Sequence, residues 1–257
     1  MYSEVVLDEI TKAESDVRSR LTDTVAKVLA LAEAYRRLGK QFTFDEDEDL
    51  DTKVNRLLIE LSDAVLEDTE SRMLRALKET NAEEDEEDTI VAWVKTNKDA
   101  QTTLDKYASH LKFILEGWIA IGFAEKISKG SLITGIFTYM ANPYVSPMWQ
   151  KAFKEGQDYA SDIIRSGGYH WGKGTPISVL KGMSIVEADL INTAYNRGLI
   201  FGFASRGAIG YRVYRGSNYD CPDCDEVCAV VHPIDEIVLP VHPNCVCYAV
   251  PIFPGEE

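Results

Sequence analysis

The sequence predicts a mainly α-helical protein, with helical N-terminal and middle regions and a small α+β unit at the C-terminal end. Apolar residues recur at helical spacing through most of the 257 residues, and the spacing changes to alternation near residue 210. All five cysteines lie between Cys221 and Cys247, and 45% of the residues are hydrophobic, which is enough for a core. These signals divide the chain into residues 1–88, 89–183 and 184–257.

The formal charge of −15 is concentrated near the N-terminus. Residues 1–90 contain 12 Lys and Arg against 25 Asp and Glu, a charge of −13, whereas residues 91–200 carry +3 and residues 201–257 carry −5. Because an acidic segment cannot neutralise phosphates, we do not expect strong sequence-independent binding of nucleic acid by the first 90 residues. Residues 91–200 are slightly basic, so a weak contact of this region with DNA remains open. The first residues show no secretory signal, so we expect residence in a reducing cytoplasm.

Two apolar stripes predict the first two helices, within an acidic helical region over residues 1–88. The first stripe comprises Val17, Leu21, Val25, Val28 and Leu29. It predicts a helix that ends near Leu38, because Gly39 is a helix stop. The second stripe comprises Val54, Leu58, Leu61, Val65, Met73 and Leu77. The acidic run over residues 83–88 contains no apolar residue, so we expect a solvated linker there.

The middle region, residues 89–183, is predicted to be helical with an uncharged loop. Its first stripe comprises Leu104, Tyr107, Leu111, Ile114 and Trp118. Residues 131–150 carry no charge, but Pro143 and Pro147 argue against a membrane helix, so we expect a buried or contact-making loop. A further helix is predicted from Trp149 to a stop at Gly167 and Gly168.

Residues 184–257 are predicted to be one helix followed by a small β unit. Ser184 and Glu187 have the spacing of a capping box, which predicts a helix start there and an end near Gly207 or Gly210. Three apolar residues, Ile209, Tyr211 and Val213, then alternate with Arg212 and Tyr214, as in a half-buried strand. Residues 237–241 and 246–253 have the same β character.

A cysteine and histidine pattern in this last region indicates a metal site. Cys221 and Cys224 are three positions apart, and after 17 further residues come His242, Cys245 and Cys247. Two thiolates on a tight turn and a second His/Cys pair on another turn supply the four ligands of a tetrahedral zinc ion. Cys221, Cys224 and His242 are the first three, and both Cys245 and Cys247 remain candidates for the fourth, because alternate strand residues point to the same side.

The predicted ion is structural, since four protein ligands close the coordination shell whereas a catalytic ion keeps an open position. Cys228 and His232 are nearby reserve ligands. The alternative interpretation is that the cysteines are simply reduced, or form disulfides after release from the cell. Zinc is favoured because the short β tail has little apolar material with which to hold itself together.

Other motifs do not predict catalysis. Residues 167–173 match the spacing of a phosphate-binding loop, but Gly174 replaces the required Ser or Thr. The series Asp45, Asp47, Asp49 begins like a calcium loop but lacks its glycine and its final glutamate. No Ser/His/Asp arrangement is recognisable, so we expect no catalytic and no cofactor-binding residues, and a protein that is not an enzyme.

The C-terminal elements together resemble a known family. They are a helix containing Asn192-Thr193-Ala194-Tyr195-Asn196-Arg197-Gly198, an aromatic strand, Asp220-Cys221-Pro222-Asp223-Cys224, His242-Pro243-Asn244-Cys245-Val246-Cys247 and a closing Pro251. This order resembles the phage Mu protein F-like family of head morphogenesis proteins, over about residues 150–257. The chain departs from the family pattern at Ala194, where an acidic residue is usual, and at Val246, where Arg is usual.

The resemblance implies a structural minor head protein of a tailed bacteriophage, associated with portal or capsid proteins during head assembly. It implies a place in the head interior or at the portal vertex of the virion, in the host cytoplasm during assembly, and no membrane association. Two alternatives remain. The segment Tyr211-Arg212-Val213-Tyr214-Arg215-Gly216 resembles the start of some ADP-ribosyltransferases, which keeps a phage- or toxin-related ADP-ribosyl-transferring or metal-dependent enzyme open. A non-viral zinc-binding adaptor would carry the same metal motif.

Overall fold

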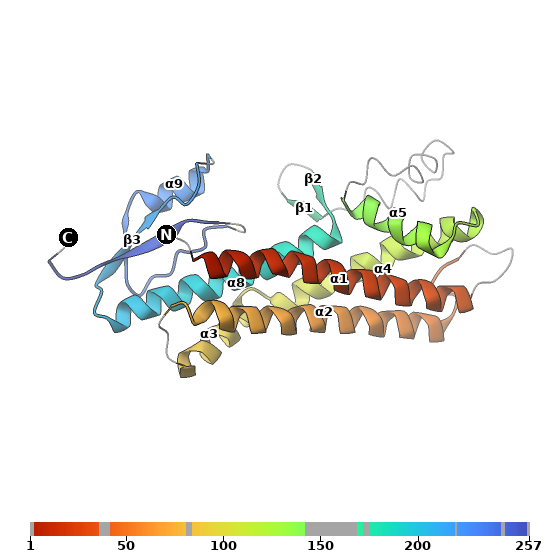
Figure 1. The fold of residues 1–257 in the computed structure, drawn as a ribbon, viewed down its shortest axis with the longest axis horizontal. Helices are drawn as coiled ribbons and strands as arrows, with labels where there is room; N and C mark the ends of the chain where they lie inside the picture. Colours follow the sequence, from red (N-terminus) through yellow and green to blue (C-terminus); the bar gives the residue numbers. More distant parts are fainter. Residues whose placement is uncertain are drawn as a thin grey trace. The chain divides into compact units, whose positions relative to one another are not determined.

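The computed structural model describes residues 3–35, 42–80, 84–141, 169–171, 175–218, 220–242 and 245–255 (Figure 1). Its described part is mainly α-helical with a small C-terminal sheet, so the predicted fold class is confirmed. The helices are α1 (Glu4–Ala34), α2 (Glu48–Leu77), α3 (Glu84–Asn97), α4 (Ala100–Ala124), α5 (Lys129–Ala141), α8 (Val179–Ser205) and α9 (Pro222–Cys228). The strands are β1 (Tyr169–Trp171), β2 (Thr175–Ile177), β3 (Gly210–Tyr214), β4 (Val231–Pro233) and β5 (Tyr248–Ile252).

The chain forms two compact units, each built from segments that are distant in sequence. The first unit comprises Met1–Ala13, Leu66–Gln101 and Ile185–Glu257. The second unit comprises Glu14–Val65 and Thr102–Ser184. The candidate metal ligands all belong to the first unit.

In the second unit, the apolar stripes predicted from the sequence are buried. The buried residues are Val17, Leu21, Val25, Val28 and Leu29 of α1, Val54, Leu58, Leu61 and Val65 of α2, and Leu104, Tyr107, Leu111, Ile114 and Trp118 of α4. Tyr35, just after α1, accepts a hydrogen bond of 2.9 Å from Lys53 and donates one to Asp49. These contacts join the end of α1 to the start of α2. Helix α1 ends at Ala34, earlier than predicted, and Leu38 lies outside the described residues.

The acidic turn before α2 is a helix start. One carboxylate oxygen of Asp47 accepts hydrogen bonds of 3.2 Å from the backbone N–H groups of Asp49 and Leu50, which is N-capping. The same connection contains Phe44, which is fully buried and whose N–H donates a 2.7 Å bond to Glu116 of α4. Burial raises the pKa of Glu116, and the bond from Phe44 opposes that shift. The connection is thereby fixed to α4.

The uncharged segment is a helix where we predicted a loop. Helix α5 covers Lys129–Ala141, and residues 142–150 lie outside the described residues. The prediction was wrong for the first part because the two prolines come only at 143 and 147, which leaves the preceding 13 residues without a helix breaker. A Cβ at Gly135 would lie 2.7 Å from the Trp118 ring, so α5 packs directly on α4. Across the described part of the chain, no helix combines the length and apolar composition needed to cross a membrane.

A two-stranded sheet follows further along the second unit. Strands β1 and β2 pair antiparallel, with Trp171 opposite Thr175 and His170 opposite Pro176. The helix predicted from Trp149, its stop at Gly167 and Gly168, and residues 172–174 of the phosphate-loop-like segment lie outside the described residues. The described residues that follow the glycines therefore form a strand, and no helix starts directly after them as a phosphate-binding loop requires.

In the first unit, a buried ion pair joins α1 to α2. Glu9 accepts hydrogen bonds of 2.9 Å from Arg72 and from Arg75. The Glu9 and Arg72 side chains are buried, whereas about half of the Arg75 side chain is exposed. The Arg75 hydrogen bond and the nearby guanidinium charges hold the pKa of Glu9 below its ordinary value, against the effect of burial.

From Glu84, where the described residues resume, the acidic run that we predicted to be a linker is the start of helix α3. The prediction was wrong for two physical reasons. Negative residues are favourable in the first turn of a helix, where the free backbone N–H groups carry partial positive charge. The apolar residues that a helix needs follow at once, since Ile90, Val91 and Val94 are buried. From α8, the Arg197 guanidinium lies 3.6 Å from the centre of the Trp93 ring of α3.

Helix α8 begins one and a half turns before the predicted capping box. Ser178 caps it, since its hydroxyl accepts a 3.1 Å bond from the N–H of Lys181. Ser184 lies inside the helix, where its hydroxyl donates to the Leu180 carbonyl at 2.8 Å. Glu187 accepts a 2.9 Å hydrogen bond from Thr69 of α2 instead of capping. The helix is buried on most sides, so its apolar pattern gives no clear start, although its end at Ser205 before Gly207 agrees with the prediction.

The C-terminal sheet has the strand order β4-β3-β5, with both pairs antiparallel. Tyr211 and Val213 of β3 are buried while Arg212 and Tyr214 are exposed, which confirms the predicted alternation for these residues. Ile209, predicted on the buried face, precedes the strand and is 45% exposed. Strand β5 falls within the predicted range 246–253, and β4 was not predicted. Residues 237–241 form no strand, which corrects the prediction.

The segment that replaces the predicted strand is held by a side chain. The Tyr211 hydroxyl donates a 2.7 Å bond to the Glu236 carbonyl and accepts a 3.1 Å bond from the N–H of Val238. Leu239 is buried against the same core. The hydroxyl of a side chain therefore satisfies backbone groups that a neighbouring strand would otherwise bind. The alternating pattern of the sequence cannot distinguish these two cases.

Candidate metal centre

The first two candidate ligands lie at the start of helix α9. Cys221 is the N-cap residue, with extended backbone angles of φ −144° and ψ 102°, and Pro222 occupies the first turn. Proline favours this position because its fixed φ suits a helix and its missing N–H is not needed there. One turn of helix then brings Cys224 into the interior, with 3% of its surface exposed. The predicted tight turn is therefore the beginning of a short helix.

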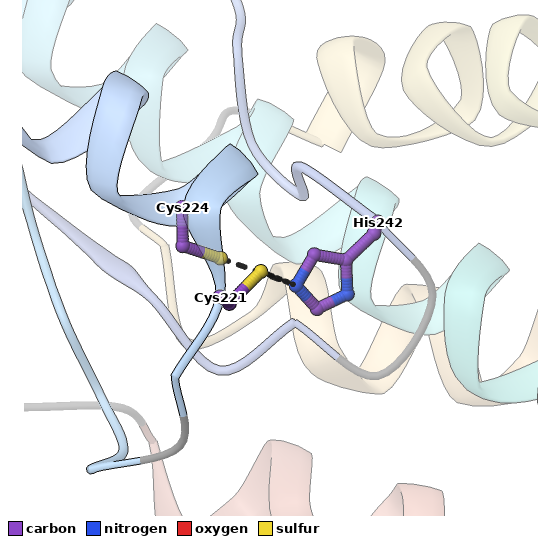
Figure 2. Close-up of side chains that lie close together, drawn as sticks. All are labelled: Cys221, Cys224 and His242. Atoms are coloured by element: carbon purple, nitrogen blue, oxygen red, sulfur yellow. Dashed lines mark hydrogen bonds between the residues drawn. The ribbon is translucent and has the colours of Figure 1, made fainter.

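His242 lies against both of these cysteines (Figure 2). Its Nε2 atom is 3.4 Å from Sγ of Cys221 and 3.1 Å from Sγ of Cys224. The N–H of Cys245 donates a 3.0 Å bond to the His242 carbonyl, which closes the segment that carries both residues. Residues from the start of α9 and from the segment before β5 thus meet through their side chains.

Cys245 and Cys247 approach the same centre from the segment directly before β5. Both are buried, and Sγ of Cys245 lies 4.0 Å from Sγ of Cys224. The ligand atoms of Cys224, Cys245 and Cys247 lie within 4.8 Å of one another, as do those of Cys221, Cys224 and His242. Both groups contain Cys224, so the structure brings all five predicted ligands around this one residue.

The donor set fits a metal ion. A tetrahedral site with metal–sulfur bonds of about 2.3 Å and metal–nitrogen bonds of about 2.0–2.1 Å places its ligand atoms about 3.5–3.8 Å apart. The observed distances of 3.1 Å, 3.4 Å and 4.0 Å lie on both sides of that range. Thiolates and imidazole are soft and borderline ligands, which suit zinc and similar ions better than magnesium or calcium. The cluster can therefore hold a metal ion, and five donors exceed the four that a tetrahedral ion needs.

Burial disfavours free thiolates at this centre. It raises the pKa of Cys224 and Cys245 above the ordinary range, and that of Cys228 to about 11. Cys245 differs from the others because the backbone N–H groups of Cys247 and Val241 bond to its sulfur and oppose the rise in its pKa. An ion that binds here must therefore displace thiol protons.

Arg215 supports the start of α9. Its guanidinium donates a 3.1 Å bond to the Cys221 carbonyl and also pairs with Asp225. This places the positive charge of Arg215 near the cysteines. If more than two thiolates bind a divalent ion, the site has a net negative charge, which Arg215 offsets. Arg215 belongs to the segment that resembles the start of some ADP-ribosyltransferases. In this structure its side chain binds the start of α9.

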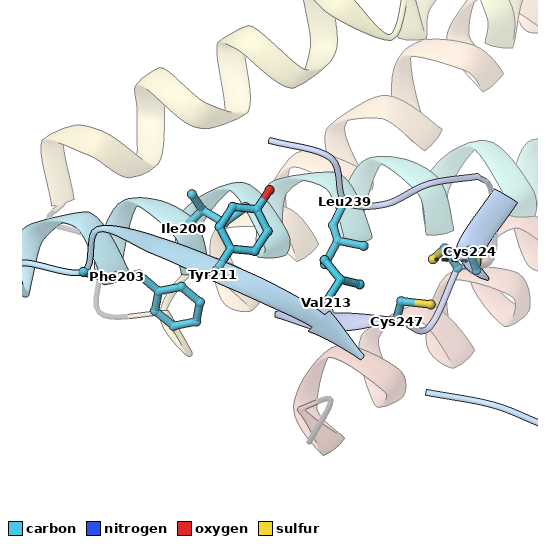
Figure 3. Packing of buried hydrophobic residues seen from close by; sticks show 9 residues of the cluster. Ile200, Phe203, Tyr211, Val213, Cys224, Leu239 and Cys247 are labelled. Atoms are coloured by element: carbon cyan, nitrogen blue, oxygen red, sulfur yellow. Dashed lines mark hydrogen bonds between the residues drawn. The ribbon is translucent and has the colours of Figure 1, made fainter. Parts of the chain in front are cut away.

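The centre is continuous with the hydrophobic core of the C-terminal unit (Figure 3). That core combines Ile200 and Phe203 of α8, Tyr211 and Val213 of β3, and the buried residues Cys224, Leu239, Cys245 and Cys247. At Gly216, directly after β3, the backbone approaches that of Val246 so closely that a Cβ would lie 1.7 Å from its carbonyl oxygen. The residue between the two late cysteines is therefore fixed against the end of β3.

A buried amide from α8 holds the same segment. The side-chain N–H of Asn192 donates a 2.6 Å bond to the Cys245 carbonyl, and the Asn192 oxygen accepts a 2.6 Å bond from Asn196. Both asparagines are buried. Sequence reasoning placed Asn192 and Asn196 in this helix without a role. Their buried polar side chains in an apolar helix are the signal that identifies them, because such groups need partners.

The two reserve ligands, Cys228 and His232, differ in their distance from the metal centre. His232 is buried, its Nε2 atom is 2.8 Å from the Val227 carbonyl, and its ring lies beside that of Tyr211. It belongs to neither group of converging ligand atoms. Cys228 interacts with Cys247 at the edge of the cluster, where it is half-buried. The structure thus separates His232 from the centre and leaves Cys228 next to it.

Comparison of the chain with protein-family models, with curated proteins and with solved structures found no match. The Cys/His cluster, the mainly helical fold and the residues quoted for the phage family resemblance are the observations on which a function can be proposed.

Proposed function

We propose that this chain is a structural minor head protein of a tailed bacteriophage, whose C-terminal unit is held together by a zinc ion and docks on portal or capsid proteins. The observation that carries the proposal is the convergence of Cys221, Cys224, His242, Cys245 and Cys247 around one centre. These are also the residues through which the chain resembles the phage Mu protein F-like family.

Zinc is the ion that the donor set favours. Sulfur and imidazole ligands in tetrahedral arrangement are typical of structural zinc, which has no redox chemistry of its own. Because five donors are available, the protein can fill all four positions, and a filled shell leaves no place for a substrate. This supports a structural role over the alternative of a metal-dependent enzyme.

The bound ion would cross-link two parts of the C-terminal unit. Cys221 and Cys224 belong to the start of α9, while His242 and Cys245 precede β5. The three-stranded sheet is small, and one of its strands has only three residues. A metal cross-link restricts the unfolded chain and adds binding free energy to folding, which a small unit needs. The resulting rigid unit is suited to docking.

The partner assignment rests on the resemblance. We propose portal or capsid proteins as partners, the head interior or portal vertex as the location, and an acidic N-terminal region that faces basic partners or stays clear of packaged DNA. The charge of −13 over residues 1–90 supports that last point, since negative charge repels phosphates.

Metal analysis tests the zinc site. Protein purified under reducing conditions should contain about one zinc per chain, and the double variant Cys221→Ser/Cys224→Ser should contain none. Cys228→Ser is the matched control and should keep its zinc, because Cys228 lies at the edge of the cluster. Zinc retained by the double variant would contradict the ligand assignment.

Particle composition tests the assembly role. Heads purified from the phage that encodes this chain should contain it, detected by mass spectrometry, and the chain should co-purify with the portal or major capsid protein of the same genome. Deletion of residues 1–90 should reduce its incorporation into heads. Heads that lack the wild-type chain, together with no co-purification, would contradict the proposal.

A further inference from the structure

The outer face of the C-terminal sheet is apolar and exposed. Tyr211 and Val213 point into the core, so Arg212 and Tyr214 of β3 point to the opposite face. The strand register places Val231 of β4 and Val250 of β5 on either side of Arg212. Residues paired across antiparallel strands share a face, so these three side chains form one row.

The next row of this outer face is aromatic. Tyr214 pairs with Tyr248 of β5, and their rings stack with centroids 5.8 Å apart and an angle of 20° between the planes. Tyr214 is 41% exposed, Val231 is 49% exposed and Val250 is 39% exposed. Large exposed apolar side chains gathered on one face of a soluble unit indicate an interaction surface.

One unpaired cation lies at the centre of this face. Arg212 is exposed, and within the described residues it has no ion pair, whereas Arg215 pairs with Asp225. Arg206, the other cation after residue 200, bonds to the Gly202 carbonyl of its own helix. Tyrosine and arginine are the residues that contribute most often to the binding energy of protein interfaces. An arginine between two valines is suited to a carboxylate that arrives on an apolar partner.

We propose that the outer face of the β4-β3-β5 sheet, formed by Arg212, Tyr214, Val231, Tyr248 and Val250, docks an apolar protein segment that places one carboxylate against Arg212. This deepens the proposed function, because it rests on the docking role of the C-terminal unit and names the docking face and the chemistry of the partner. The rim near β4 carries exposed Asp235 and Glu236, so further acidic residues of the partner are disfavoured there.

The test is a selection of short random peptides on the full-length, zinc-loaded protein. Wild-type protein should enrich apolar peptides that contain Asp or Glu. Arg212→Glu should change the enriched charge to Lys or Arg, because the central charge is reversed. Val231→Lys/Val250→Lys should reduce binding of the wild-type peptides by about tenfold or more, since two apolar contacts are lost. All three residues are exposed, so these variants should keep their fold, which zinc content and circular dichroism verify.

Ile59→Lys is the matched control, because Ile59 is a large exposed apolar residue of helix α2, outside the sheet. It should bind the selected peptides as wild type does. The inference is overturned if wild type enriches no peptides, or if the enriched peptides bind equally well to Arg212→Glu. The selection uses no phage component, so its failure with zinc and head incorporation intact would remove the docking face alone. Loss of zinc or head incorporation would instead count against the proposed function.

Discussion

The side-chain amide of Asn192 donates a 2.6 Å hydrogen bond to the backbone carbonyl of Cys245, one of the two late candidate ligands. Loss of a group that holds a metal ligand in position typically weakens metal binding by about 10–100-fold. Asn192→Ala should weaken zinc binding by about tenfold or more, measured by competition with a chelator. Asn97→Ala is the control, since Asn97 also donates to a backbone carbonyl but is exposed on α3. Equal zinc affinity of Asn192→Ala and wild type would contradict the positioning role.

Gly216 should tolerate no side chain. A Cβ there would lie 1.7 Å from the Val246 carbonyl oxygen, and a backbone atom cannot move aside without displacing the segment between Cys245 and Cys247. Gly216→Ala should therefore lower the free energy of unfolding by about 3 kcal/mol, measured by urea denaturation. At Gly130, a Cβ would meet nothing within 4 Å. Gly130→Ala should instead be neutral or stabilise by up to about 1 kcal/mol, because alanine favours helix. Similar effects of the two substitutions would argue against the close approach.

The ion pair of Glu9 should make stability depend on pH. Its pKa in the folded protein is lowered, chiefly by the hydrogen bond from Arg75. The stabilisation is therefore complete above the pKa of Glu9 in the unfolded chain, and is lost as the pH falls through the lower pKa of the folded state. Glu9→Gln should cost about 3 kcal/mol near neutral pH, because buried Arg72 loses its ion pair with the Glu9 carboxylate, and the difference from wild type should shrink in acid. Thermal unfolding as a function of pH measures this.

Glu14→Gln is the control for that experiment, since Glu14 is exposed on the same helix. Its unfolding curve should follow that of wild type at every pH. A deficit of Glu9→Gln that stays constant down to acid pH would show that the carboxylate charge is not the cause.

Cys245 should be the fourth ligand in preference to Cys247. Its sulfur lies 4.0 Å from that of Cys224, the residue that both groups of converging ligand atoms share, and its backbone carbonyl is held by Asn192. In cobalt-substituted protein, the thiolate-to-metal charge-transfer absorption reports the number of sulfur ligands. Cys245→Ser should reduce this absorption and lower metal affinity, whereas Cys247→Ser should leave both close to wild type. The reverse pattern would assign Cys247.

Periodicity predicted the long helices because the apolar residues of each stripe lie on one side of the helix. The stripe ending at Trp118 is buried as expected, and the alternation at Tyr211 and Val213 gives the expected strand. A helix that is buried on most sides has no apolar stripe, so its boundaries cannot be read from the spacing of apolar residues. Helix α8 is enclosed on most sides, so Ser184 could not be distinguished from a cap by spacing alone.

The five candidate ligands were predictable because cysteine and histidine are rare elsewhere in the chain and their spacing has chemical meaning. Asn192 was not, because its partner Cys245 is 53 positions away and no local pattern connects them. The role of Gly216 was not predictable from the sequence either, because the close approach of the two backbones depends on how β3 and the segment before β5 pack. Tertiary contacts of this kind decide the geometry of the centre.

The interleaved composition of the two units has a consequence for translation. The second unit is complete when residue 184 has been synthesised, but the first unit still lacks the whole of its third segment, Ile185–Glu257. Leu77 and Thr80, buried in the finished protein, belong to the second segment of this unit and pack against Gly198 of α8, where a Cβ would lie 2.5 Å from Leu77 and 2.7 Å from Thr80. On a ribosome that adds about 5–20 residues per second, these surfaces stay uncovered for several seconds. A nascent chain that stops early would thus expose apolar surface of this earlier segment, which chaperones or proteases can recognise.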